Sequence, residues 1–167
     1  MKKKSKYKPR PVRINAVEWV VEGVKPVLES GNNITMYRAK NHSAMTEILQ
    51  GRGNLEQLSY LINSLNICEA YAIYGKGSDW RAEIREAQDY VYDMACNALD
   101  TNKFIFRGHE IKAINLAMQI HELQLEQSTT NEFDKMAAYV IEKIVSKKTR
   151  VIKSKERQSN AEQMLQT

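Results

Sequence analysis

The side chains best placed for chemistry in this 167-residue chain are cations gathered near its two ends. Residues 2–13 (KKKSKYKPRPVR) hold seven Lys or Arg and no acid, and residues 147–157 (KKTRVIKSKER) hold six basic residues against one Glu. The whole chain carries +5 and its last ten residues carry −1, so residues 14–146 carry a net −6. An acidic body between two basic arms predicts a polyanionic partner or an acidic protein surface.

The basic arms have the composition of segments that neutralise nucleic-acid phosphates. Lys and Arg in such an arm follow the backbone or enter a minor groove, and the ring of Tyr7 could stack on a base. We therefore expect contacts mainly to phosphate, with little sequence preference. The candidate nucleic-acid-binding residues are Lys3, Lys4, Lys6, Tyr7, Lys8, Arg10, Arg13, Lys147, Lys148, Arg150 and Lys153.

Two other interpretations of the arms stay open. The arms could steer the protein toward an acidic surface of another protein, as an inhibitor or adaptor, with Trp, Tyr and Arg of the body as binding hot spots. They could also be solubilising tails, or tails folded back on the acidic body. The two arms could meet within one chain or come from two subunits of a homodimer.

The other reactive residue types are not spaced for catalysis. His42, His109 and His121 lack the spacing of a zinc or di-iron site, and neither a Gly-x-Ser-x-Gly nor a Walker sequence occurs. Cys68 and Cys96 lie in apolar helical patterns, where a cysteine is usually a small buried hydrophobe. We therefore predict a non-enzymatic protein with no catalytic residue, no cofactor and no metal.

Two smaller patterns have competing explanations. Residues 75–78 (GKGS) could cradle a phosphate with Lys76, although two glycines between helices are explained equally well by a helix end followed by a helix start. Five tyrosines lie on two consecutive predicted helices and form either a core layer or an exposed patch for a partner. They are Tyr60, Tyr71, Tyr74, Tyr90 and Tyr92.

The apolar periodicity that must position these residues is helical almost throughout. Residues 54–74 contain no Lys or Arg and predict a buried central helix. Ile34–Tyr37 predicts a short strand, Asn41 or Ser43 caps a helix that ends before Gly51, and Phe104–Phe106 predicts a second strand or a loop that plugs the core. Thr129 and Glu132 match a capping box that opens the last helix, which could continue into the C-terminal arm.

We therefore predict an all-α bundle of five or six helices with at most one two-stranded ribbon. The expected organisation is a basic arm (residues 1–13), a helical domain (residues 14–146) and a basic, polar tail (residues 147–167). The sequence has no apolar run of the length needed for a signal peptide or a membrane span, so we expect a cytoplasmic protein without a membrane partner.

Four segments together resemble small helical proteins carried by temperate phages and prophages of proteobacteria. They are KYKPRPVR (Lys6–Arg13), NHSAM (Asn41–Met45), DWRAEIREAQDY (Asp79–Tyr90) and NLAMQIHELQL (Asn115–Leu125). The resemblance implies a viral or mobile-element origin, and with it a role in binding nucleic acid or in binding and blocking a host protein. Such an acidic host protein could belong to a defence or transcription complex. The resemblance assigns no role to any individual residue.

Overall fold

The computed structural model describes residues 24–29 and 31–152, and over these residues the chain is all-α. The described elements are η1 (Val27–Glu29), α2 (Asn32–Leu49), α3 (Leu55–Ile73), η2 (Ser78–Trp80), α4 (Arg81–Thr101), α5 (Gly108–Glu126) and α6 (Thr130–Val145). The five α-helices in this part of the chain confirm the predicted helical bundle. The basic N-terminal arm and most of the helix predicted from Ile14 lie outside the described residues.

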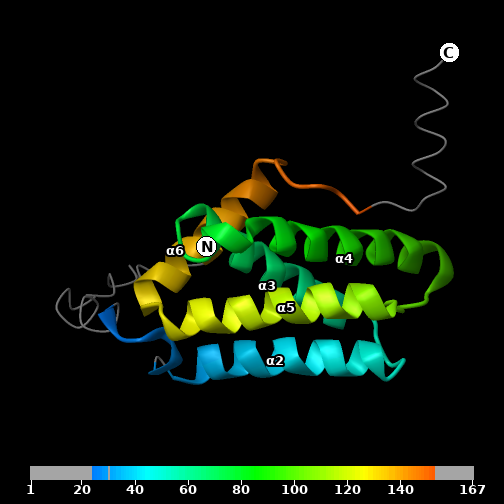
Figure 1. Cartoon of the computed structure of the whole chain (residues 1–167), viewed down its shortest axis with the longest axis horizontal. Helices are drawn as coiled ribbons and strands as arrows, with labels where there is room; N and C mark the ends of the chain where they lie inside the picture. Colours follow the sequence, from blue (N-terminus) through cyan, green and yellow to red (C-terminus); the bar gives the residue numbers. More distant parts are fainter. Residues whose placement is uncertain (1–23, 30, 153–167) are drawn as a thin grey trace, which may run out of the picture.

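Helix α3 is the central helix, as the long stretch without Lys or Arg predicts. It begins at Asn54, whose side-chain oxygen accepts hydrogen bonds from the amides of Glu56 and Gln57 and so caps the helix. It packs against α2, α4, α5 and α6, and Figure 1 shows it passing behind α5 between α4 and α2. Leu61 is buried in one hydrophobic cluster and Tyr71 in another, which explains why so much of the surface of α3 is apolar.

The strand predicted at Ile34–Tyr37 is wrong, because these residues form the first turns of α2. Ile34, Asn41, Ala44 and Ile48 are all buried, and their spacing places them on one face of a continuous helix. Asn41 and Ser43 therefore lie inside α2 and do not cap a later helix. No two-stranded ribbon forms among residues 24–29 and 31–152, where the one β-bridge joins Pro26 to Thr129.

The loop between α4 and α5 plugs the core, the second of the two structures predicted for Phe104–Phe106. Phe104 and Phe106 are buried in the main hydrophobic cluster, whereas Ile105 between them faces solvent. Phe104 also approaches Gly53 so closely that a Cβ at position 53 would lie 2.9 Å from the Phe104 Cβ. The plug therefore ties the loop after α2 to the loop after α4.

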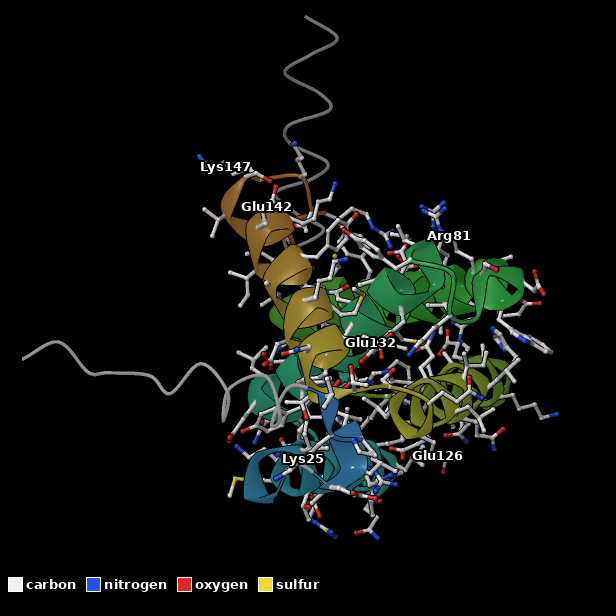
Figure 2. The ribbon with its side chains drawn as sticks, turned by 90° about the vertical axis from the view of Figure 1, so that its left-hand side faces the viewer. Lys25, Arg81, Glu126, Glu132, Glu142 and Lys147 are labelled. Carbon is white, nitrogen blue, oxygen red and sulfur yellow. The ribbon has the colours of Figure 1, made fainter. Side chains whose placement is uncertain are left out.

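The predicted capping box opens α6. The Thr129 hydroxyl accepts from the Glu132 amide at 3.4 Å, and the Glu132 carboxylate accepts from the Thr129 amide at 2.8 Å. The segment before α2 reinforces this start, because the Val27 amide donates to the Ser128 carbonyl at 2.8 Å. The far end of α6 rises away from α2 and α5, as the positions of Glu142 and Lys147 in Figure 2 show.

The end of α6 corrects the prediction that this helix continues into the C-terminal arm. The Lys147 amide donates to the Ile144 carbonyl at 3.1 Å, and the Lys148 amide donates to the Lys143 carbonyl at 2.9 Å. This bonding is that of a Schellman turn, with Lys147 in the left-handed conformation at φ 55°. The same turn ends α2 and α3, but there a glycine takes the left-handed position. Because no glycine follows Val145, the end of α6 could not be predicted from the sequence.

Candidate functional site

Three of the eleven predicted contact residues lie in the described part of the chain, namely Lys147, Lys148 and Arg150. They belong to residues 147–152, which follow α6 and which we term the C-terminal strap. The other eight fall in residues 1–23 or 153–167, outside the described residues. They are Lys3, Lys4, Lys6, Tyr7, Lys8, Arg10, Arg13 and Lys153.

The C-terminal strap lies back along the bundle instead of leaving it. Figure 1 shows it running from the end of α6 along α4. The Arg150 guanidinium is 2.7 Å from the Asp89 carboxylate and 4.6 Å from the centre of the Tyr92 ring. The Tyr92 hydroxyl donates to the Val151 carbonyl at 3.3 Å, and Ile152 packs against the main hydrophobic cluster. The strap is thus held by an ion pair, a ring contact, a hydrogen bond and an apolar anchor.

A groove of about 610 Å³ lies between α3, α4, α6 and the C-terminal strap. Its floor is apolar, with Ile62, Leu65 and Ala70 from α3 among the lining residues. Basic side chains from three separate stretches of sequence line it, and the acids that line it are Glu69 and Asp89. The basic residues are Arg81 and Arg85 of α4, Lys143 of α6, and Lys148 and Arg150 of the C-terminal strap.

The groove is electropositive because its two carboxylates do not balance its five cations. Glu69 is shared: the Arg85 guanidinium lies 2.8 Å and the Arg81 guanidinium 3.7 Å from the same carboxylate oxygen. The hydrogen bond to Glu69 raises the pKa of Arg85, which keeps that guanidinium charged. Asp89 pairs with Arg150. The lining residues therefore sum to a net charge of +3, within a body whose net charge is negative.

Two aromatic rings line the groove, and each has a cation over it. Arg150 lies over Tyr92, and the Lys143 ammonium is 5.1 Å from the centre of the Tyr139 ring. The Tyr74 ring meets the Tyr139 ring edge to face, with centroids 5.5 Å apart. Cations beside aromatic faces in a concave site are a combination that binds phosphates and bases together.

The tyrosine core layer, one of the two arrangements predicted for these rings, does not form. Of the five tyrosines singled out from the sequence, only Tyr71 is buried, whereas Tyr74 is half exposed and Tyr60, Tyr90 and Tyr92 are partly exposed. Burial raises the pKa of Tyr71 to about 12. Partial exposure is what leaves the Tyr92 ring at the wall of the groove.

Lys76, the cation of the loop at residues 75–78, forms hydrogen bonds within the protein. The Lys76 ammonium donates to the Gln127 carbonyl at 2.7 Å, to the Ser128 hydroxyl at 3.1 Å and to the Glu132 carboxylate at 2.8 Å. Lys76 therefore joins the α3–α4 connection to the start of α6. A phosphate at this loop would have to displace those contacts.

Cys68, Cys96 and His121 are buried in the core, whereas His42 and His109 are exposed. Cys68 and Cys96 are buried as free thiols, as predicted, and burial raises the pKa of Cys68 to about 12. His121 is fully buried and its Nε2 lies 2.7 Å from the Tyr37 hydroxyl. No group of three His, Cys, Asp or Glu among residues 24–29 and 31–152 could hold a metal ion. Within the same ranges, no helix is both long and apolar enough to cross a membrane.

Arg81, Arg85 and Lys143 are groove residues that were not predicted. In the sequence, Arg81 and Arg85 occupy the polar face of an amphipathic helix, and such a face is usually only solvated. Lys143 lies four residues before the predicted C-terminal arm, which begins at Lys147, and was therefore counted with the helical domain. Their convergence depends on the packing of α4 and α6 against α3, which the sequence does not reveal.

Comparison with models of known protein families, with curated proteins and with solved structures gave no match.

Proposed function

We propose that this protein binds nucleic acid, mainly through phosphate contacts, and that it acts by binding rather than by catalysis. The observation behind the proposal is the convergence of Arg81, Arg85, Lys143 and the C-terminal strap on one groove with a net charge of +3. Phosphate contacts from Lys and Arg supply most of the sequence-independent affinity of such proteins. The basic N-terminal arm adds further cations, and the resemblance to phage-encoded helical proteins accords with this role.

The charge distribution favours a phosphate polymer over an acidic protein surface. An acidic protein surface presents scattered carboxylates, which suit scattered cations on a convex face. Here the cations line a concave groove together with Tyr92 and Tyr139, so phosphate and base could be contacted side by side. The acidic body outside the groove would repel a polyanion, which confines it to the groove and the arms.

Fluorescence anisotropy of the full chain with labelled oligonucleotides, in a series of salt concentrations, tests the proposal. Replacing Lys147, Lys148 and Lys153 with Gln should reduce the slope of log affinity against log salt by about 0.7–0.9 for each phosphate that is no longer neutralised. Replacing Lys3, Lys4, Lys6, Lys8, Arg10 and Arg13 with Gln should reduce it further. The matched control is Lys103→Gln with Lys112→Gln, which removes two exposed cations outside the groove.

Two results would contradict the proposal. One is a full chain that binds neither single-stranded nor double-stranded oligonucleotides at low salt. The other is binding that does not respond to salt, because phosphate contacts release counterions and must do so. In either case the acidic protein partner becomes the better hypothesis.

A further inference from the structure

We infer that the groove receives a single, unpaired strand, with its phosphates on the basic walls and a base against Tyr92. This inference rests on the proposed function and names the form of nucleic acid that the groove accepts. Three features of the groove support it, namely its size, the placement of its cations and the state of its two rings.

The size of the groove suits an unpaired segment. Its volume of about 610 Å³ lies in the middle of the range for sites that enclose small organic ligands, about 300–1,000 Å³. An unpaired strand can insert its backbone and turn a base toward the wall, as in other single-strand binding grooves. In a duplex both backbones lie on the outside with paired bases between them. A duplex would therefore touch only the rim and the arms.

The cations lie on different walls of the groove. Arg81 and Arg85 come from α4, and Lys143 and Lys148 come from α6 and the C-terminal strap. Figure 2 shows Arg81 and the end of α6 as separate prominences on the same side of the molecule. A strand lying between these walls would meet cations on both sides along its length.

The two rings are prepared for stacking by the cations that cover them. A cation over an exposed ring is held weakly, whereas a phosphate binds the same cation through charge-assisted hydrogen bonds. Arriving phosphates would therefore draw Lys143 from Tyr139, and would draw Arg150 from Tyr92 in competition with its ion pair to Asp89. The uncovered ring face is then available to a base, and stacking of this kind tolerates any base.

The test measures binding of the full chain to a labelled oligothymidylate, to an oligouridylate of the same length and to a duplex of that length. Arg85→Gln with Lys143→Gln should weaken single-strand binding about tenfold at 0.15 M salt. The salt slope should fall by about 1.4, because two phosphates are left without a cation and each accounts for about 0.7. Binding of the duplex should change less than twofold. The control pair is again Lys103→Gln with Lys112→Gln, which should leave both affinities unchanged.

A second variant separates stacking from charge. Tyr92→Leu should weaken single-strand binding while leaving the salt slope unchanged, because the number of neutralised phosphates stays the same. Photocrosslinking of a bromouridine-containing strand, followed by mass spectrometry, should identify Tyr92 or a neighbouring groove residue. Thermal unfolding of each variant checks that the fold is kept.

The outcomes separate this inference from the function on which it rests. If the groove pair behaves like the control while Gln at positions 3, 4, 6, 8, 10 and 13 weakens binding, nucleic-acid binding stands and the groove inference fails. If duplex and single strand bind equally well and weaken equally, the preference for a single strand is wrong. If the full chain binds neither, both proposals fail.

Discussion

Arg150 of the C-terminal strap lies 2.7 Å from Asp89 in the middle of α4, so the acidic body holds a residue of its own basic tail. The pair is more than half exposed, at 54% for Arg150 and 60% for Asp89. Ion pairs this exposed contribute little to stability because water and salt screen them. The contact therefore matters more for the charge of the groove than for the free energy of unfolding.

Asp89→Asn should strengthen oligonucleotide binding. The change removes one of the two acids that line the groove and leaves the Arg150 charge unpaired and available to a phosphate. One additional phosphate contact corresponds to about a fourfold gain at 0.15 M salt. The free energy of unfolding should change by less than about 0.5 kcal/mol. Glu126→Gln removes an exposed acid remote from the groove and serves as the control. Equal effects of the two substitutions on oligonucleotide binding would contradict a role of the groove in binding.

Gly53→Ala should destabilise the bundle through a steric clash. The added Cβ would lie 2.9 Å from both the Ile48 side chain and the Phe104 Cβ, which are buried and cannot move aside without disturbing the core. We expect a destabilisation of about 1–3 kcal/mol, as for other overpacked sites. Gly108→Ala is the matched control, because a Cβ there meets nothing within 4 Å and alanine favours a helix. Urea unfolding of both variants gives the comparison, and equal stabilities would refute the close packing at Gly53.

Lys147→Gly should stabilise the end of α6. Lys147 holds a left-handed conformation that costs a residue with a Cβ about 1–2 kcal/mol, and glycine avoids this cost while losing somewhat more chain entropy on folding. The expected net gain in the free energy of unfolding is about 0.5–1 kcal/mol. Lys148→Gly removes the same charge one position later, where the backbone is not left-handed, and should not stabilise. A lower stability of the Lys147 variant would show that the helix does not end in this turn.

The elements that the sequence predicted correctly depend on local rules. The central helix followed from a stretch without Lys or Arg, and the start of α6 followed from Thr129 and Glu132, whose mutual hydrogen bonds need only four consecutive residues. Ile34–Tyr37 failed for the opposite reason. Ile34, Thr35 and Tyr37 have high strand propensity, which favoured a separate strand. Ile34 nevertheless continues the helical spacing of Ala44 and Ile48, and packing of this helix against α3 overrides the propensity.

The groove could be predicted only in part, because it is a product of tertiary structure. The strap cations Lys148 and Arg150 were expected from charge alone. The place of Arg81 and Arg85 in the groove depends on how α4 and α6 pack against α3, and the strap joins them only because the chain reverses at Lys147. That reversal depends on a left-handed lysine, which no sequence rule favours.

His121 gives the protein a stability that should fall as the solution is acidified. Burial among apolar side chains lowers the pKa of His121 to about 4, and the ring contacts the Tyr37 hydroxyl at 2.7 Å and the Gln124 amide oxygen at 3.4 Å. In the unfolded chain the pKa of histidine is about 6.5. Between these two values the unfolded state binds a proton that the folded state does not bind. The free energy of unfolding should therefore fall by up to about 1.4 kcal/mol for each pH unit between about 6.5 and 4.

Urea unfolding at a series of pH values from 7 to 4 measures this dependence, and NMR of the imidazole carbons tests its cause directly. The His121 ring should stay neutral in the folded protein down to about pH 4. Glu132, whose pKa is lowered by Lys76 and by the Thr129 amide, adds a decrease in the same direction, but only at the lower pH values where its carboxylate becomes protonated. His121→Gln should therefore remove the dependence between pH 6.5 and 5 and leave the more acidic part. A flat free energy across pH 7 to 5 in the wild-type chain, or a His121 ring that titrates near pH 6.5 while folded, would contradict the buried neutral histidine.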